Sequence, residues 1–236
     1  MVNLIISLFI FLFTILCTDE SAQDQPDPYR KQRENMVKTQ IENRDINDKA
    51  VLQAMRTVKR HLFLPAELIN SAYYDSPQPI GYGQTISQPY IVAYMTEIIN
   101  PKPEHRILEI GTGSGYQAAV LAEIVDSVYT IEIIPELHKP AADRLKKLAY
   151  DNVKAKEADG YYGWEEHAPF DAVIVTAAAE YIPPLLIQQL KDGGKMVIPV
   201  GSPLLTQWLM LVEKNGDKIK TTSLMPVLFV PFTRKK

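Results

Sequence analysis

Cysteine is almost absent from this sequence, because Cys17 is the only one in 236 residues. A single cysteine forms no internal disulfide and supplies no cysteine-based metal site. The four histidines, His61, His105, His138 and His167, show no ligand spacing either, so we predict no metal. The fold must therefore be stabilised by its hydrophobic core.

The sequence also has little excess charge of either sign. Its formal net charge is -3, with 25 Lys and Arg against 28 Asp and Glu, and the charges are scattered along the chain. Nucleic acids and anionic membranes attract concentrated positive charge, so we expect neither as a partner. Hydrophobic residues make up 46% of the chain, which is enough for one sizeable core. We expect a single domain over residues 23–236, acting as a monomer.

The N-terminal apolar run, Met1–Cys17, is too short to span a bilayer comfortably and is followed at once by polar residues. This shape is typical of a signal peptide, so we expect residues 1–22 to direct export to the periplasm or beyond, leaving a mature domain outside the bilayer. Two alternatives stay open. One is a retained membrane anchor, and the other is lipidation of Cys17, although Leu16 is bulky for that cleavage site. The protein would be cytoplasmic if the segment is not an export signal.

The region that follows is helical in pattern. Asp27 and Pro28 form a good helix start, and the helix is expected to run to about Arg44. Asn47 can cap a second helix. In that helix the apolar residues recur at helical spacing: Val51, Leu52, Met55 and Val58. We interpret this region as a helical cap that covers a sheet edge.

Residues 73–88 are rich in proline and glycine, which predicts a long loop without regular structure. A loop of this length is unusual for a mere connection, so we expect it to be functional. A helix is expected to begin at Pro89 and to end before Pro101.

From Arg106 onward, short apolar runs alternate with helical segments, which indicates a parallel sheet covered by helices on both faces. Strands are expected at 107–110, 127–131, 153–157 and 171–176. Three further strand patterns have no helices between them, at 195–199, 206–212 and around 224–230. The fold class is therefore α/β, with a mostly parallel sheet that ends in an antiparallel hairpin.

A glycine-rich turn follows the first of these strands, with the sequence Gly111-Thr112-Gly113-Ser114-Gly115 before a helix from about Tyr116. Glycines let the backbone approach a ligand closely, and a helix N-terminus offers free N–H groups. The Gly-x-Gly-x-Gly spacing differs from the dinucleotide fingerprint, which argues against NAD. The alternative is a tight turn that binds nothing.

Acidic residues follow the next two strands, Glu132 after the second and Asp159-Gly160 after the third. The carboxyl ends of parallel strands meet at one edge of the sheet, where ligands bind. Glu132 can accept hydrogen bonds from ribose hydroxyls, and Asp159 from the exocyclic amine of adenine. The alternative for both is a solvated charge at the end of a strand.

Several motifs occur in an order that resembles the protein-L-isoaspartate O-methyltransferases. They are Asp75–Gly81, Gln84-Thr85-Ile86-Ser87-Gln88-Pro89, Leu108–Tyr116, Ala168–Asp171, Gln189–Lys195, Ile198–Gly201, Gln207 and Phe229-Val230-Pro231. The match covers roughly Tyr29–Thr233. The glycine motif is shared by many methyltransferases, whereas Thr85-Ile86-Ser87-Gln88-Pro89 is close to a family signature.

The resemblance implies a seven-stranded, Rossmann-like methyltransferase sheet with S-adenosyl-L-methionine as cofactor. It implies methylation of the free α-carboxylate of L-isoaspartyl residues in damaged proteins, which starts repair through a succinimide. It assigns the active-site position to Ser87, for which a helix N-cap is the alternative role. The implied cofactor contacts are Gln84, Thr85, Ile86, Ser87, Glu109, Gly111, Thr112, Gly113, Ser114, Gly115, Glu132, Asp159, Gly160 and Gln207.

The sequence departs from the family pattern at three positions. Ala158 replaces a usual glycine, Leu228 stands where the bacterial enzymes often have arginine, and Pro140 falls inside the helix expected after Glu132. Two rival functions stay open. The chain could methylate another small molecule or protein side chain, or it could be a binding module that has lost catalysis.

Overall fold

Seven strands form one sheet in the order β5-β4-β3-β6-β7-β8-β9. The computed structural model describes residues 27–202 and 205–234, so the expected signal segment and Cys17 lie outside the described residues. The strands are β3 (Arg106–Ile110), β4 (Ser127–Glu132), β5 (Val153–Glu157), β6 (Phe170–Val175), β7 (Leu190–Val200), β8 (Gln207–Asn215) and β9 (Lys218–Val227). Pairing is parallel from β5 through β7 and antiparallel for β7, β8 and β9. The expected α/β class and the antiparallel end of the sheet are confirmed.

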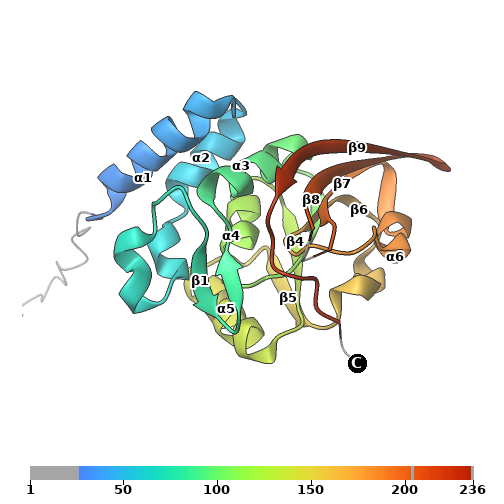
Figure 1. Cartoon of the computed structure of the whole chain (residues 1–236). Helices are drawn as coiled ribbons and strands as arrows, with labels where there is room; N and C mark the ends of the chain where they lie inside the picture. The colour runs from blue at the N-terminus through green and yellow to red at the C-terminus, as the bar shows by residue number, and fades with distance from the viewer. Residues whose placement is uncertain (1–26, 203–204, 235–236) are drawn as a thin grey trace, which may run out of the picture.

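The two faces of the sheet bury alternate residues of each strand in separate cores. Ile107 packs with the helices of the N-terminal half, whereas its neighbour Leu108 packs with Trp164 and Leu186 on the other face. Side chains on a strand point alternately to opposite faces, so a continuous apolar run fits a strand that is covered on both sides. Figure 1 shows this sheet between two layers of helices and turns.

Six α-helices lie around the sheet in the described part of the chain: α1 (Arg30–Met36), α2 (Lys49–Thr57), α3 (Pro89–Ile98), α4 (Tyr116–Ala122), α5 (Pro135–Lys147) and α6 (Pro184–Gln188). The expected start of α3 at Pro89 is confirmed. Helix α5 runs through Pro140, which lies in its second turn. None of the helices within the described residues is long and apolar enough to cross a membrane.

Two details of the N-terminal helices differ from the sequence-based expectation. The first helix does not continue regularly to Arg44, because a π-helical turn (Val37–Ile41) and a 3-10 turn (Glu42–Arg44) follow α1. The cap of α2 is Asp48 rather than Asn47, since the Asp48 carboxylate accepts hydrogen bonds from the N–H groups of the first helical turn. A carboxylate at this position also stabilises the positive end of the helix dipole.

The segment expected to lack regular structure forms a small antiparallel ribbon of β1 (Gln78–Gly81) and β2 (Gln84–Ile86). Its turn contains Tyr82 and Gly83, which both have positive φ values, 53° and 70°. The prolines do not prevent pairing, because a two-stranded ribbon leaves one side of each strand unpaired. In Figure 1 the ribbon lies beside the labelled strands of the sheet, on the side of the N-terminal helices.

The chain beyond β9 also differs from expectation, because the last strand ends at Val227 rather than near Val230. The following residues cross the carboxyl edge of the sheet. There the Ala178 N–H donates to the Val230 carbonyl, and the Phe232 N–H donates to the Ala178 carbonyl, at 2.8 Å each. This C-terminal segment therefore lies beside the end of β6.

Candidate functional site

The glycine-rich turn joins β3 to α4 with three residues in the left-handed region. Gly111, Gly113 and Gly115 have φ values of 98°, 52° and 87°. A side chain is disfavoured at such angles, so the glycines follow from the backbone path. The turn is anchored by the Gly111 N–H, which donates to the Ile131 carbonyl of β4 at 2.8 Å.

Glu132 ends β4 and is 5% exposed. Its carboxylate accepts hydrogen bonds from the Gly113 N–H at 2.8 Å, the Ile133 N–H at 2.9 Å and the Ile134 N–H at 3.0 Å. Hydrogen bonds to a charged acceptor are stronger than neutral ones. Glu132 therefore fixes the glycine turn against the end of the neighbouring strand.

Glu109 lies under the glycine turn and is fully buried. The Thr130 hydroxyl donates to one of its carboxyl oxygens at 2.5 Å, and the Thr112 hydroxyl lies 2.6 Å from that of Thr130. The other oxygen is buried without a hydrogen-bond partner. Burial, opposed by the Thr130 hydrogen bond and aided by the nearby charge of Glu132, raises the pKa of Glu109 to about 8. A cationic ligand group placed here would stabilise the ionised form of Glu109.

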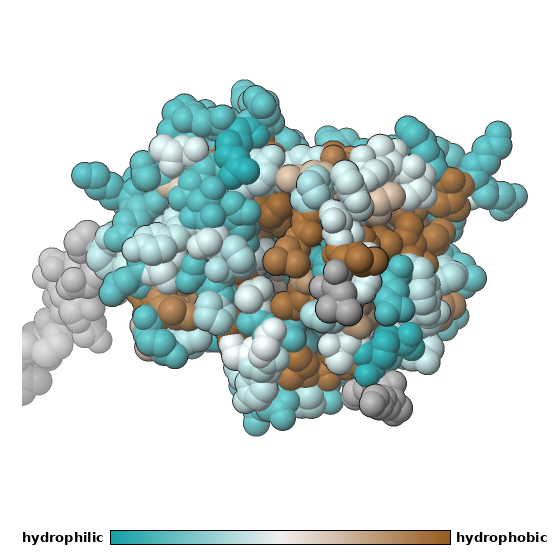
Figure 2. Space-filling view, viewed as in Figure 1, coloured by the Kyte–Doolittle hydropathy of each residue, from teal (hydrophilic) through white to brown (hydrophobic). Residues whose placement is uncertain are grey.

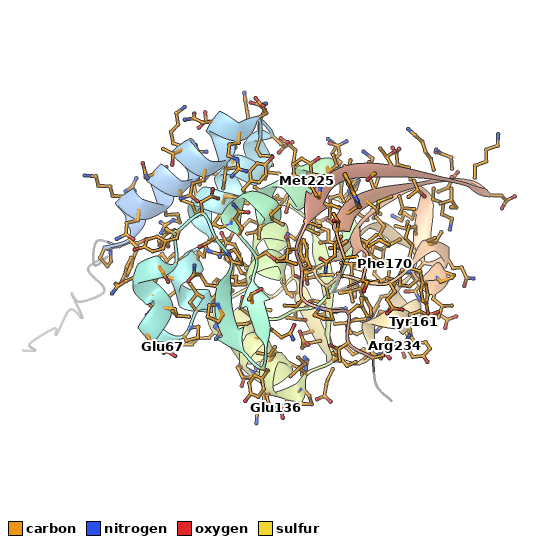
Figure 3. All side chains as sticks on the ribbon, viewed as in Figure 1. Glu67, Glu136, Tyr161, Phe170, Met225 and Arg234 are labelled. Carbon is orange, nitrogen blue, oxygen red and sulfur yellow. The ribbon has the colours of Figure 1, made fainter. Side chains whose placement is uncertain are left out.

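Asp159 and Gly160 follow β5 at the same edge of the sheet. A Cβ added to Gly160 would lie 2.3 Å from a methyl carbon of Ile110, so the two strand ends pack too closely for a side chain. The Asp159 carboxylate accepts from the Tyr161 N–H and from Arg234 Nε, whose nearer contact is 2.8 Å. Figure 3 shows Arg234 beside Tyr161, over whose ring its guanidinium lies at 3.8 Å.

Two adjoining hollows open at this edge, of about 540 Å³ and 300 Å³ with their mouths included, and we call them together the ligand cavity. The glycine turn and Glu132 form one wall, and the β1–β2 ribbon supplies the opposite one. The predicted residues that line the cavity are Gln84, Thr85, Ile86, Ser87, Glu109, Gly111, Thr112, Gly113, Ser114, Glu132 and Gly160. The structure thus brings together predicted residues from four separate parts of the sequence.

Three predicted residues do not line the ligand cavity. Gly115 lies behind it at the start of α4, and Asp159 is turned toward Arg234. Gln207 begins β8 and is 1% exposed. Its side-chain amide both donates to the Phe229 carbonyl and accepts from the Phe229 N–H, so it holds the C-terminal segment.

A further hollow of about 960 Å³ adjoins the ligand cavity, and we call it the groove. The two share Thr85, Ser87, Thr176 and Val230. The other groove residues are mostly apolar: Arg44, Pro77, Gln88, Tyr90 and Ile91, and residues 225–229 at the end of β9 and just after it. Figure 2 shows apolar surface in this region, between the β1–β2 ribbon and the C-terminal strands.

Sequence reasoning missed Thr176 and residues 230–233. Thr176 follows β6 and lines both hollows and the groove, and residues 230–233 close the ligand cavity from the C-terminal side. A signal for Thr176 was available, because it is a polar residue at the carboxyl end of a predicted strand. Phe229-Val230-Pro231 resembles a family motif, but that resemblance gave it no site role, because the position of residues 230–233 depends on the path of the chain after β9.

Residues 31–236 match the family described as protein-L-isoaspartate(D-aspartate) O-methyltransferase (PCMT). The chain belongs to this family. A protein-L-isoaspartate O-methyltransferase of Opitutus terrae is 58% identical over 205 residues, which is 87% of this chain and 88% of the relative. A second relative, protein-L-isoaspartate O-methyltransferase 2 of Shewanella sediminis, is 51% identical over 96% of this chain and 94% of its own length.

Solved structures of the PCMT family share the fold. One described as a protein-L-isoaspartate O-methyltransferase superposes with a TM-score of 0.77 at 25% identity, covering 86% of this chain and 65% of that one. A Plasmodium falciparum structure, also described as a PCMT protein, contains S-adenosyl-L-homocysteine. It covers 86% of this chain and 99% of its own, with a TM-score of 0.75 at 27% identity.

The ligand cavity of this PCMT chain fits S-adenosyl-L-methionine. The unpaired buried oxygen of Glu109 suits a ligand that carries positive charge. Gly111 and Gly113 let the backbone lie against the ligand, and Glu132 stands at the end of β4, where a ribose is bound in related α/β folds. These residues would hold the methyl donor next to Thr85, Ser87 and Thr176.

Proposed function

We propose that this chain methylates the free α-carboxylate of L-isoaspartyl residues in damaged proteins, and that Ser87 positions that carboxylate. The observation that carries the proposal is the junction of the ligand cavity with the groove. Ser87, Thr85 and Thr176 line both the ligand cavity and the groove, so a donor in the cavity and a peptide in the groove would meet at these three hydroxyl groups.

The composition of the groove favours a carboxylate substrate over an amine. Among its described lining residues there is no Asp, Glu, His or Lys to act as a general base, and Arg44 is the only charged one. A carboxylate is ionised near pH 7, since its ordinary pKa is about 4, whereas a lysine amine must first lose a proton. S-adenosyl-L-methionine supplies an electrophilic methyl group when it is bound. Alignment of the carboxylate oxygen is then the main task of the protein.

Ser87 acts here as a hydrogen-bond donor and not as a nucleophile. No histidine lies in the described lining of either hollow or the groove, so no base is placed to activate its hydroxyl. The alternative role as a helix cap is not observed, because the N-cap of α3 is Gln88 and no side chain caps that helix. The neighbouring backbone nitrogen is expected to attack the carbonyl of the methyl ester that forms, which expels methanol and gives a succinimide.

A paired-peptide assay tests the proposal. Purified protein is incubated with methyl-labelled cofactor and with two peptides that differ only in an isoaspartyl or an aspartyl residue. We expect label in the isoaspartyl peptide alone, and we expect Ser87→Ala to reduce turnover with little change in affinity for S-adenosylhomocysteine. Equal labelling of both peptides, or labelling of another substrate only, would contradict the assignment.

We also propose that residues 1–22 direct export, and that the mature protein is monomeric. The apolar run with a polar stretch after it supports export. The ligand cavity and the groove are complete within one chain, which supports a monomer. N-terminal sequencing of protein from fractionated cells distinguishes cleavage, lipidation and retention, and light scattering measures the oligomeric state. An uncleaved cytoplasmic protein would contradict the export proposal.

A further inference from the structure

A fully buried arginine lies in the N-terminal helical region, outside the motifs that identify the site. Arg60 begins the 3-10 turn Arg60–Phe63 and is 0% exposed. Burial lowers the pKa of its guanidinium to about 10, so the group remains charged at neutral pH. Among the described residues Arg60 has no carboxylate in an ion pair. Burial of a charge without an ion-pair partner costs folding free energy, so we expect Arg60 to have a function that offsets this cost.

The guanidinium of Arg60 bridges two segments that are distant in sequence. Its Nε donates to the Ala72 carbonyl at 2.7 Å, and one terminal nitrogen donates to the Ser87 carbonyl at 2.8 Å. The other terminal nitrogen is buried without a hydrogen-bond partner. The planar fork of an arginine can hold two carbonyl oxygens at fixed directions, which a lysine ammonium cannot do.

Arg60 also touches the other half of the site. Its guanidinium lies over the ring of Tyr116, 4.8 Å from the ring centre. Tyr116 is the first residue of α4, directly after the glycine turn, and it lines the ligand cavity. One side chain therefore contacts both the backbone of Ser87 and the helix that starts at the glycine turn.

Ser87 lies between a strand and a helix and belongs to neither. The position of its backbone therefore depends on contacts such as the Arg60 hydrogen bond. Strand β2 ends at Ile86 and helix α3 starts at Pro89. Gln88 is held through its side chain, which donates to the Asp75 carboxylate at 2.7 Å. The Arg60 bond fixes the peptide plane that follows Ser87, and with it the direction of the Ser87 side chain.

We propose that Arg60 is a positioning residue for the methyl transfer, which holds Ser87 in register with the glycine turn. The N-terminal helical region, which packs against α3 and α4, is then part of the active site. This inference rests on the proposed function. A displacement of about 1 Å at a reacting group can reduce turnover about 100-fold, so the loss of one such bond has a measurable effect.

The test compares Arg60→Lys with a matched control, Arg33→Lys. Arg33 is also buried in the N-terminal region, 6% exposed, and its Nε donates to the Arg56 carbonyl, but it lines neither the ligand cavity nor the groove. We expect both variants to lower the melting temperature. Only Arg60→Lys should reduce kcat on the isoaspartyl peptide, by about 10- to 100-fold. Its Kd for S-adenosylhomocysteine should stay within about 3-fold of the wild-type value. An equal kcat in the two variants would overturn the proposal.

Two further measurements keep the outcome interpretable. If Arg60→Lys does not fold, the neutral Arg60→Gln is measured in its place, and a folded Arg60→Gln with wild-type kcat also overturns the proposal. Hydrogen exchange of residues 84–92 needs no turnover, and we expect it to be faster in the Arg60 variant than in the Arg33 variant. A wild-type protein that leaves isoaspartyl peptides unlabelled would refute the proposed function, while unchanged exchange in the Arg60 variant would refute the positioning role.

Discussion

The Thr176 hydroxyl donates to the Gly111 carbonyl oxygen at 2.8 Å, and it also lies 3.0 Å from the Ile110 carbonyl. Gly111 is the first residue after β3, and Thr176 is the first after β6. The sheet order reverses between these two strands, since β4 and β5 lie on one side of β3 and β6 on the other. The contact therefore lies at the reversal of strand order, where open α/β sheets bind their ligands.

Gly111→Ala is expected to damage this contact and to weaken cofactor binding. A Cβ at Gly111 would lie 2.3 Å from the Thr176 hydroxyl oxygen, and the residue has a φ of 98°. We expect a stability loss of about 2–4 kcal/mol, from backbone strain and a displaced threonine, and at least a 10-fold rise in the S-adenosylhomocysteine Kd measured by calorimetry. Gly193→Ala is the control, because Gly193 has a φ of 76° with no atom within 4 Å of the added Cβ. Unchanged affinity in Gly111→Ala would contradict the role of this contact.

Much of this arrangement could be predicted from the sequence, because it depends on local pattern and on one rule of parallel sheets. The apolar runs located β3 through β6, and the polar residues after each run were expected at one edge. Gly111, Glu132 and Gly160 do meet there, around the ligand cavity. Ligands bind at the carboxyl ends of parallel strands whatever the details of side-chain packing. This part of the site could therefore be predicted without knowledge of the tertiary structure.

The remaining features depend on contacts between distant segments. The segment in which Gln78 pairs with Ile86 is predicted from the sequence to be a loop, because it is rich in proline and glycine. Its strands are too short to show a clear alternation of apolar and polar residues. The Arg60 bond to Ser87 spans 27 residues and leaves no periodic signal. Arg234 reaches Asp159 across 75 residues only because the chain after β9 crosses the sheet edge.

Stability should depend on pH through Glu109. Burial raises its pKa in the folded protein to about 8, from an ordinary value of 4.5. The folded state then holds a proton that the unfolded state has already released, so this contribution to stability is complete below pH 4.5 and declines as the pH rises toward 8. We expect Glu109→Gln to lose less stability than the wild type between pH 5 and pH 8, in denaturant titrations without cofactor. Parallel curves for the two proteins would show that Glu109 is ionised in the fold.

Arg234→Ala should loosen the C-terminal wall of the ligand cavity. Arg234 pairs with the buried Asp159 and stacks on Tyr161, and residues 230–233 just before it line the cavity. The pair is partly exposed, so we expect only about a 3- to 5-fold rise in the S-adenosylhomocysteine Kd. Lys220→Ala breaks an exposed pair with Glu213 and is the control. Tighter binding in Arg234→Ala would instead mean that Arg234 competes with the ligand for Asp159.

Arg44 is expected to govern peptide affinity and not turnover. Its guanidinium lies 3.6 Å from the centre of the Tyr90 ring and 3.0 Å from an Asp75 oxygen, so it is held in place at the groove with part of its surface exposed. An isoaspartyl peptide brings a carboxylate into this groove, and a fixed cation stabilises its binding in both the ground state and the transition state. Arg44→Gln should therefore raise KM by about 5- to 10-fold with little change in kcat.

Measurement of KM at high salt distinguishes this electrostatic role of Arg44 from a purely structural one. The difference in KM between wild type and Arg44→Gln should shrink in 0.5 M salt, about where screening shortens the reach of charges below 5 Å. Arg30→Gln removes the same charge from an exposed position on α1 that does not line the groove, and it should leave KM unchanged. A fall in kcat with an unchanged KM would place Arg44 with Arg60, as a residue that shapes the loop around Ser87 instead of binding the peptide.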